Sequence, residues 1–391
     1  MTDRAQTARE AAAGLRRFGA RLHDNSVLIG FDGFVDSIIT VVDTRHDTER
    51  FDKVATIDRL GRKVLAAAGQ SSNIELVVEY QKLGGNGPIM ANCLATVGLP
   101  ATYIGALGYP EIHPVFAEFA RHARCFSLAD PGLTDALEFD DGKVMLGKLQ
   151  TLRDVNWSRL VEVVGLETLG DILGRARLIG VTNWTMLTNM NGIWEGLIEQ
   201  VLPKLDQPPG GRRLLFVDLA DPRKRAADDI AAAMRLLGRF EKHVDVVLGL
   251  NLSEAGQVGR VLGLDVPEAE ADAVAAVEST AAAIREALDL TGVVVHPRHG
   301  AAATMRPGAG GEAATAQFQG PFVRAPKLST GAGDNFNAGF CLGLMADLPL
   351  EQALCVGTAT SGFYVREARS ATLDELAEFC AELPAPEPVS A

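Results

Sequence analysis

Hydrophobic positions along the chain form short apolar or β-branched runs, and segments with helical spacing lie between them. Strands that alternate with helices form βαβ units, so the pattern predicts an α/β fold with a central, mostly parallel sheet flanked by helices on both faces. Ligands of such sheets bind beyond the carboxyl ends of the strands, so functional residues should directly follow strands. The runs expected to form strands are Val27–Gly30, Ala101–Ile104, Leu178–Val181, Leu214–Val217, Val244–Leu248 and Gly292–His296. The segments expected to form helices are Pro88–Val97, His113–Ala123, Asn191–Leu202, Ala226–Glu241, Ser253–Val261, Glu270–Ala287, Gly333–Met345 and Leu350–Arg366.

Two insertions interrupt this alternation, at approximately 37–83 and 134–152. The first has strand-like alternation at both of its ends and an expected helix, Ala55–Ala68, between them. The second has the pattern of a β-hairpin around Asp140-Asp141-Gly142. We expect the two insertions to form a small β-rich sheet that projects from the main one, where a lid over a ligand site would lie. The alternative is a surface decoration without function.

The composition of the chain limits the classes of function. Its 391 residues are 47% hydrophobic, which provides enough apolar surface for a packed core and excludes a disordered chain. We expect one α/β domain over 1–391, with a flexible, Pro-rich tail at 384–391. The net charge of −13 argues against nucleic-acid or anionic-membrane binding. The stretch 83–110 has no charged residue, but its glycines and prolines leave no helix long enough to span a membrane.

The cysteines and the N-terminal segment point to a compartment. Five cysteines, an odd number, include no CxxC pair, which predicts reduced thiols without a disulfide framework or zinc site. Residues 1–17 form a polar segment without the apolar core of a signal peptide. Together these features predict a cytoplasmic location.

The strongest chemical signal is the segment Thr330-Gly331-Ala332-Gly333-Asp334, which leads directly into an expected helix. Its two glycines allow the backbone N–H groups to point inward, and the start of a helix adds partial positive charge, so the turn suits a phosphate. A carboxylate beside such a turn is unfavourable unless it has a role there. The role that fits Asp334 is to accept the proton of an attacking hydroxyl. The alternative is structural, with Asp334 capping the helix.

Two carboxylates, Asp32 and Asp36, follow the first expected strand, where each can accept hydrogen bonds from hydroxyl groups of a ligand. They can equally belong to a turn, because Asp and Gly are ordinary turn residues. Gly85 and Asn86 then lie in a loop that exposes its backbone before an expected helix. Asn86 can present both an acceptor and donors to a polar ligand.

Asn251 and Glu254 lie where an expected strand is followed by a helix, and their spacing is that of a capping box. A functional interpretation stands beside this structural one. Mg²⁺ prefers oxygen ligands and keeps its waters, so the two side chains could hold it through water. Arg298, after the last expected strand, could reach nucleotide phosphates, or it could be a surface residue without function.

With these motifs in this order, the chain resembles the ribokinase-like (PfkB) carbohydrate kinase family over nearly its whole length. Gly84-Gly85 before a helix, with Gly98 and Gly105-Ala106-Leu107-Gly108 after it, is similar to the first family signature. The segment from Thr330 to Asp334 is similar to the second, more specific signature. Asn251-x-x-Glu254 is similar to a family element tied to magnesium and phosphate. The resemblance implies a ribokinase-like central sheet with a β-rich lid over the sugar site.

The resemblance also implies an activity, in which ATP donates a phosphoryl group to a primary hydroxyl of a sugar or sugar-like alcohol, nucleosides included. Asp334 would be the catalytic base. The residues that would form the anion hole for the nucleotide phosphate are Gly331, Ala332, Gly333 and Thr330. Those that would line the sugar site are Asp36, Gly85 and Asn86, with Asp32 as an additional candidate that the resemblance does not settle. Asn251 and Glu254 would hold metal and phosphate. Arg298, at a place where the chain departs from the family pattern, is a further candidate for a nucleotide contact.

The implied cofactors are ATP and Mg²⁺, with activation by a monovalent cation left open. A homodimer is one implied assembly, because dimers formed through the lid are common in the resembled family. Two alternatives remain open, an ADP-dependent sugar kinase of the same superfamily and a non-catalytic sugar or nucleoside sensor on this scaffold. The alcohol itself also stays open, with hexoses, pentoses, nucleosides and sugar acids among the candidates.

Overall fold

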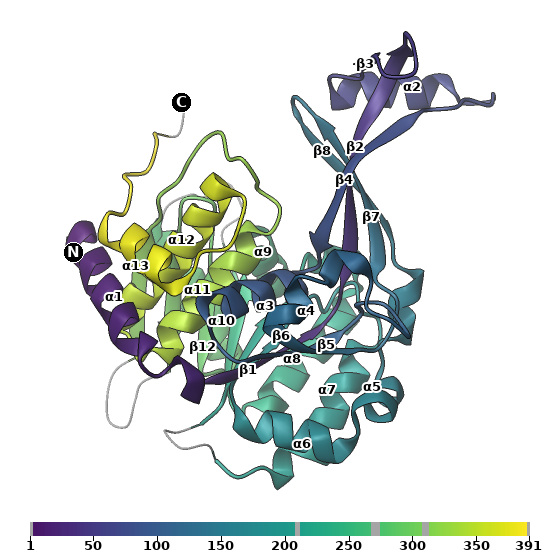
Figure 1. Cartoon of the computed structure of the whole chain (residues 1–391). Helices are drawn as coiled ribbons and strands as arrows, with labels where there is room; N and C mark the ends of the chain where they lie inside the picture. Colours follow the sequence, from purple (N-terminus) through teal and green to yellow (C-terminus); the bar gives the residue numbers. More distant parts are fainter. Residues whose placement is uncertain (1–2, 208–211, 267–273, 307–312, 389–391) are drawn as a thin grey trace.

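A nine-stranded sheet runs through the body of the protein (Figure 1). The computed structural model describes residues 3–207, 212–266, 274–306 and 313–388. The strands of the sheet are β1 (Ser26–Phe31), β5 (Ala101–Gly105), β6 (Ala123–Ser127), β9 (Ala176–Val181), β10 (Leu214–Asp218), β11 (Asp245–Leu250), β12 (Gly292–Val295), β13 (Gly300–Met305) and β14 (Ala314–Gln319). Their order is β14-β13-β12-β11-β10-β9-β1-β5-β6. The strands from β12 to β6 are parallel, and β13 and β14 extend one edge antiparallel, so the predicted mostly parallel sheet is confirmed.

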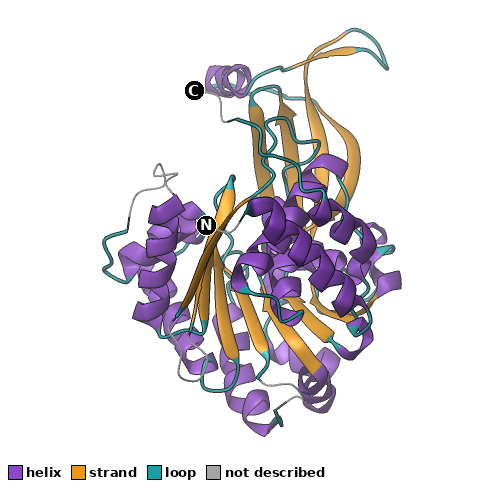
Figure 2. Ribbon diagram, turned by 90° about the vertical axis from the view of Figure 1, so that its left-hand side faces the viewer, coloured by secondary structure: helices purple, strands orange, loops and turns teal. Residues whose placement is uncertain are grey.

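Helices cover both faces of this sheet, as the sequence predicted (Figure 2). Alternate residues of each strand point to opposite faces, so Val27 and Ile29 of β1 join one buried apolar cluster, whereas Leu28 joins another. The helices that pack on the Val27 side are α1 (Arg4–Gly19), α3 (Asn86–Val97), α4 (Phe119–His122), α11 (Ala332–Met345), α12 (Leu350–Glu367) and α13 (Leu373–Ala381). The helices that pack on the Leu28 side are α5 (Trp157–Val164), α6 (Leu166–Arg175), α7 (Met190–Gly196), α8 (Ala227–Phe240), α9 (Leu252–Val261) and α10 (Val274–Leu288).

The predicted helix at 113–123 is wrong. This segment forms a 3₁₀ turn, Pro114–Phe116, and the one-turn helix α4. Phe116 and Phe119 are both buried in the same apolar cluster, and the chain then enters β6. The apolar spacing therefore reflects the burial of an irregular connection and not a continuous helix.

Two other predicted helices differ at their ends. α7 ends at Gly196, and the chain continues as a π-helical turn, Leu197–Val201, and a 3₁₀ turn, Leu202–Lys204. The first residues of the predicted helix at 270–287 lie outside the described residues, and α10 is described from Val274. The other predicted strands and helices are confirmed to within about two residues at each end. Among the helices of the described part of the chain, none combines the length and the apolar character that a bilayer crossing requires.

A second sheet, which has five strands, projects from the body and is called the projecting sheet below (Figure 1). Its strands are β2 (Phe34–Arg45), β3 (Phe51–Lys53), β4 (Leu76–Gly84), β7 (Gly132–Phe139) and β8 (Gly142–Lys148). β2 pairs with β3, β4 and β7, and β7 forms a hairpin with β8. Helix α2 (Ile57–Ala66) packs its Ile57 and Leu60 against an apolar cluster that contains Ile39 and Leu137. The small β-rich sheet predicted from the two insertions is therefore present.

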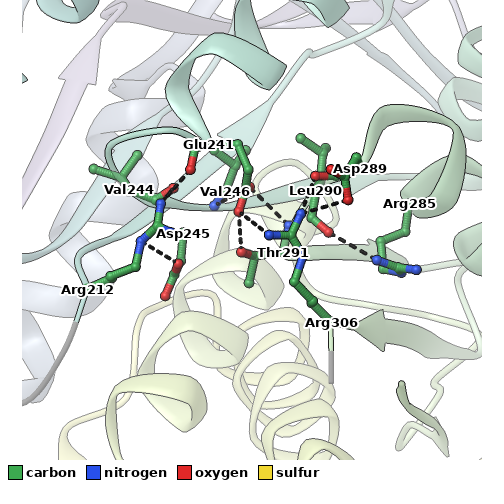
Figure 3. A network of polar contacts seen from close by, with 10 residues as sticks. All are labelled: Arg212, Glu241, Val244, Asp245, Val246, Arg285, Asp289, Leu290, Thr291 and Arg306. Atoms are coloured by element: carbon green, nitrogen blue, oxygen red, sulfur yellow. Dashed lines mark hydrogen bonds and ion pairs between the residues drawn. The ribbon is translucent and has the colours of Figure 1, made fainter. Parts of the chain in front are cut away.

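A polar network around the buried Glu241 side chain connects the amino ends of β11 and β12, at the edge of the main sheet opposite to the carboxyl ends (Figure 3). The Glu241 carboxylate accepts hydrogen bonds from the backbone N–H groups of Val246 at 3.1 Å and Thr291 at 3.0 Å. It also accepts one from the Thr291 hydroxyl at 2.6 Å. Arg306 forms ion pairs with Glu241 at 3.5 Å and with Asp289 at 2.9 Å. These bonds satisfy buried polar groups and hold the strands together at the edge away from the expected ligand site.

Candidate active site

Polar side chains collect at the carboxyl ends of the central parallel strands. β12, β11, β10, β9 and β1 are consecutive neighbours in the sheet, so their carboxyl ends meet along one edge. The Asp334 carboxylate lies close enough to this edge to be affected by the charges of Asp218 and Asp32. The polar residues at the strand ends are Asp32 after β1, Asn183 after β9, Asp218 at the end of β10, Asn251 after β11 and His296 after β12.

The predicted phosphate turn leads into α11, and Gly331 is the N-cap residue of this helix. Gly331 has a φ of 95°, and a Cβ atom at this position would lie 2.9 Å from the Tyr364 hydroxyl. That hydroxyl donates to the carbonyl of Thr330 at 2.9 Å, so α12 fixes the turn from behind. The Ala332 amide donates to the Ser329 carbonyl at 3.2 Å. The Asn335 amide donates to the Gly331 carbonyl at 3.0 Å and makes the first bond of the helix. The Gly333 amide precedes this bond, which leaves it available to an anion.

Asp334 lies in the first turn of α11 and is not its cap, so the capping interpretation of this residue is wrong. The residue is only 7% exposed, and its Oδ1 accepts a hydrogen bond from Asn86 Nδ2 at 2.8 Å. Burial raises the pKa of the Asp334 carboxyl well above its ordinary value, and the charges of Asp218 and Asp32 act in the same direction. An ionised carboxylate in these surroundings is a strong proton acceptor, as a general base for a hydroxyl must be.

Asp32 orients the start of α3. Its Oδ2 accepts hydrogen bonds from the Asn86 amide at 2.9 Å and from Asn183 Nδ2 at 2.7 Å, and its Oδ1 accepts one from the Gly87 amide at 2.8 Å. The residue is completely buried, and burial raises the pKa of its carboxyl to about 6. Because Asn86 is bonded to Asp32 through its backbone and to Asp334 through its side chain, Asp32 indirectly positions the Asp334 carboxylate.

Asp36 lies on β2, where the projecting sheet joins the body. Its partners in the strand register are Lys82 on β4 and Thr134 on β7. Burial raises the pKa of the Asp36 carboxyl, while the charge of Lys82 and a hydrogen bond from Thr134 act against this effect. A Cβ atom at Gly84 would come within 2.5 Å of the Asp36 carboxyl group, so a larger residue there would displace this carboxyl group. The charge of Asp36 also acts on Tyr364, which places it near the phosphate turn.

Asn251 and Glu254 form the predicted capping box at the start of α9. Asn251 Oδ1 accepts from the Glu254 amide at 3.0 Å, and Glu254 Oε2 accepts from the Asn251 amide at 2.8 Å. Glu254 Oε1 accepts in addition from the Asp221 amide at 2.8 Å. Burial, followed by the charge of Asp218, raises the pKa of the Glu254 carboxyl to about 7. The capping role is therefore confirmed, and the pair lies beside a further carboxylate.

That further carboxylate, Asp218, was not identified from the sequence. Its Oδ2 accepts a hydrogen bond from Asn337 Nδ2 at 2.8 Å, whereas its Oδ1 is buried without a hydrogen-bond partner. Burial raises the pKa of the Asp218 carboxyl to about 6. The only signal in the sequence is an Asp at the end of an apolar run, which is too common to single out one residue.

A cavity of about 350 Å³ opens on the other side of the phosphate turn, and its wall includes Gly333, Asn251 and Arg298. The Arg298 side chain lies over the ring of Phe322, with its guanidinium carbon 5.8 Å from the ring centre. The His296 ring stacks on Phe336, with the two ring centres 4.6 Å apart. Arg298 therefore lines the same cavity as the turn and as Asn251 of the capping box.

The residues predicted for the site therefore fall into two groups that meet at the start of α11. Asp32, Gly85, Asn86 and Asp36 lie on the side of the projecting sheet, and Asn251, Glu254 and Arg298 lie on the side of the cavity. The site also contains residues that the sequence did not indicate: Asn183, Asp218, Lys82, Lys143 and Tyr364.

Together the fold and the site define a carbohydrate kinase with the ribokinase fold. The chain belongs to the prokaryotic ketohexokinase family, whose model matches residues 3–383. A ketohexokinase from Haloferax volcanii is 30% identical over 375 residues, which are 95% of each chain.

Solved structures support the fold. A ribokinase from Cryptococcus neoformans in complex with ADP has a TM-score of 0.60 at 16% identity, covering 90% of this chain and 99% of its own. A ribokinase from Arabidopsis thaliana complexed with ribose and ATP has a TM-score of 0.58 at 14% identity, covering 92% and 99%. A nucleoside kinase from Methanocaldococcus jannaschii has a TM-score of 0.56 at 13% identity, covering 92% and 98%.

Proposed function

We propose that this carbohydrate kinase transfers the γ-phosphoryl group of ATP to the primary hydroxyl of a ketohexose, with Asp334 as the general base. The observation that carries the proposal is the buried Asp334 carboxylate, which lies in the first turn of α11 and is held by Asn86 at 2.8 Å. The ketohexose is inferred from the family and from the Haloferax volcanii relative. An alternative acceptor, a nucleoside or another sugar, is the comparison that an assay must include.

The proposed reaction needs one proton transfer and one displacement at phosphorus. The acceptor oxygen attacks the γ-phosphorus, the bond from this phosphorus to the bridging oxygen breaks, and the nucleoside diphosphate leaves. The hydroxyl proton passes to Asp334, whose raised pKa makes its carboxylate a strong acceptor. The start of α11, with the Gly333 amide, would stabilise the charge on the transferring group. Positioning and electrostatics supply most of such catalysis.

The acceptor is proposed to lie between the projecting sheet and the body. Asp36 would accept hydrogen bonds from sugar hydroxyls, and Asn86 would hold the reacting end of the sugar near Asp334. Asp32 would position Asn86 without contacting the sugar, because both of its oxygens already accept hydrogen bonds from the protein. The projecting sheet would act as a lid that excludes water and limits hydrolysis of ATP.

The carboxyl end of β10 fits the Mg²⁺ that the family implies. Asp218 Oδ1 is a buried oxygen without a hydrogen-bond partner, and the ionised form of Glu254 is disfavoured by burial and then by the charge of Asp218. We propose that Asp218 and Glu254 hold the ion through water, with Asn251 and Arg298 nearby in the nucleotide cavity. When bound, the ion would neutralise charge on the phosphates of the nucleotide.

The experiment is a coupled assay of ADP release over four ketohexoses, two aldoses and two nucleosides, followed by ³¹P NMR of the product. We expect turnover with a ketohexose and a phosphate on a primary carbon. Asp334→Asn should lower kcat by about 10²- to 10⁴-fold because it removes the proton acceptor. The matched control is Asp289→Asn, at the opposite edge of the sheet, where 90% of the side chain is exposed.

Three results would contradict the proposal. Near-normal kcat in Asp334→Asn would exclude this residue as the base. Turnover with ADP and not with ATP as the donor would identify an ADP-dependent kinase. Ligand binding without any transfer to the whole panel would favour a non-catalytic sensor.

A further inference from the structure

A lysine of the projecting sheet reaches the phosphate turn. Lys143 follows the turn of the β7–β8 hairpin, and its Nζ donates a hydrogen bond to Thr330 Oγ1 at 3.0 Å. The same Nζ forms an ion pair with Glu138 Oε1 at 2.9 Å. The Lys143 side chain is 26% exposed. A positive charge carried by the projecting sheet therefore lies next to the first residue of the predicted anion hole.

A second ion pair on the same hairpin shows what is particular to Lys143. Lys148 pairs with Asp135 at 2.7 Å, again from β8 to β7, but its side chain is 55% exposed. This pair stays within the hairpin, whereas the Lys143 pair contacts Thr330 of the body. Exposed pairs of this kind contribute little to stability, so hairpin stability alone does not explain why Lys143 is directed toward the turn.

The hydrogen bonds of Lys143 leave capacity for a ligand. An ammonium group has three N–H donors, and Glu138 and Thr330 accept from two of them. The charge of Lys143 also acts on Asp36 and on Lys82, so it lies near the proposed acceptor site as well as near the turn. Lys82 faces Asp36 in the strand register. Lys143 is the lysine whose side chain bonds directly to the phosphate turn, through Thr330.

We propose that Lys143 is a catalytic residue whose ammonium group contacts a γ-phosphoryl oxygen during transfer, so that the projecting sheet delivers positive charge to the reacting group. This inference rests on the proposed function of the turn and of Asp334. The bonds made and broken are those given above. Lys143 takes up no proton and stabilises negative charge on the phosphoryl oxygens while the bridging oxygen leaves. Glu138 holds the ammonium group in position. Charge placed beforehand at a reacting group is worth most where water is excluded.

The test compares Lys143→Gln, Lys143→Arg and the matched control Lys148→Gln in steady-state kinetics with sugar and ATP varied separately. We expect Lys143→Gln to lower kcat by about 10²-fold, in the range found when one charge-stabilising donor is removed. The KM for the sugar should change by less than about threefold, because the lost contact is made mainly in the transition state. Lys143→Arg should recover part of the activity, and Lys148→Gln should match the wild type.

A binding measurement separates catalysis from a structural role. ADP together with aluminium fluoride and the sugar imitates the transferring phosphoryl group. Lys143→Gln should bind this combination more weakly by about the factor lost in kcat, and should bind ADP alone as the wild type does. Thermal unfolding of each variant checks that its fold is intact.

The inference is overturned if Lys143→Gln and Lys148→Gln have the same kcat, or if Lys143→Gln weakens ADP binding as much as binding of the fluoride complex. Asp334→Asn distinguishes this failure from failure of the proposed function. An inactive Asp334→Asn with an active Lys143→Gln rejects the role of Lys143 alone. An active Asp334→Asn rejects the base on which both proposals rest.

Discussion

Asp32 and Asp36 lie close together in the chain, but their surroundings give them different tasks. Asp32 accepts three hydrogen bonds from the protein, two of them from amides at the start of α3. Asp36 lies on β2 beside Lys82 and Thr134, at the junction with the projecting sheet. Asp32 therefore supports the site, whereas Asp36 is the one that we expect to contact the sugar.

This difference predicts that two matched substitutions affect different properties, the KM for the sugar and the stability of the fold. Asp36→Asn should raise the KM for the sugar about 10- to 100-fold, since a hydrogen bond to a charged group contributes roughly 1.5–3 kcal/mol. Its thermal stability should stay close to that of the wild type. Asp32→Asn should lower the free energy of unfolding by about 2 kcal/mol, because its amide group would face an N–H donor of the backbone.

Steady-state kinetics and thermal unfolding of both variants check the prediction. An unchanged sugar KM in Asp36→Asn, measured on protein that unfolds at the normal temperature, would remove Asp36 from the sugar site. Normal stability of Asp32→Asn would show that the start of α3 is held by other contacts.

The sequence indicates only part of this site, for physical reasons that differ between residues. The segment from Gly331 to Asp334 is readable because glycines, a helix start and a carboxylate follow one another in the chain. Asn86 was found because it follows a glycine pair. Asp218 and Lys143 become visible only when distant segments meet, since nothing in their immediate sequence distinguishes them from an ordinary strand end or a surface lysine.

Buried acidic residues with raised pKa values cluster at the carboxyl ends of the strands. The pKa is about 6 for Asp32 and Asp218 and about 7 for Glu254, in each case mainly because of burial. The folded state therefore holds more protons than the unfolded state between about pH 4 and pH 7. Stability from this source is complete below that window and is lost as the pH rises through it. His296, whose pKa burial lowers to about 4, acts in the opposite direction.

Asp218→Asn isolates one member of the cluster. As the pH rises from 5 to 8, we expect the wild type to lose more unfolding free energy than this variant loses. The expected change is on the order of 1 kcal/mol, because the amide avoids burying a charge next to Glu254. Its carbonyl oxygen can still accept from Asn337. Urea unfolding at several pH values measures the effect.

Magnesium gives the same variant a second readout. If Asp218 holds the ion through water, Mg²⁺ should stabilise the wild type at pH 8 more than it stabilises Asp218→Asn, because a ligand stabilises only the state that binds it. A difference in unfolding free energy that does not vary with pH would contradict the raised pKa of Asp218. Equal effects of Mg²⁺ on the two proteins would remove Asp218 from the proposed metal site.

Most of the parallel strands were predictable because burial on both faces of the sheet leaves continuous apolar runs, as in β10 and β11. Strand β6 and the antiparallel strands β13 and β14 were not predicted; β13 is rich in alanine, and β14 mixes alanine with polar residues. The segment at 113–123 was overpredicted because apolar spacing does not distinguish an irregular buried connection from a helix. Tertiary contacts determine the secondary structure of such segments.

At the scale of the whole molecule, exposed apolar side chains concentrate on the projecting sheet and its helix α2. Among the described residues, most of the large hydrophobic side chains that are strongly exposed lie there: Val64, Leu65, Leu76, Val78, Tyr80, Leu133, Met145 and Leu146. The body contributes Tyr109 and Leu166. A large apolar surface exposed on one part of a protein marks an interaction site. The commonest assembly that covers such a surface is a homodimer with C₂ symmetry.

We therefore predict a homodimer formed through the projecting sheets, in which Val78 of β4 and Leu146 of β8 are buried. Val78→Glu and Leu146→Glu should each shift the protein toward the monomer, because burying a charge at an apolar interface is unfavourable. Leu166→Glu, at a side chain of the body that is 39% exposed, is the control and should leave the mass unchanged. Size-exclusion chromatography with light scattering over a range of concentrations measures the mass. A wild-type protein that stays monomeric at every concentration, or a Leu166→Glu variant that dissociates as readily as the other two, would contradict this assembly.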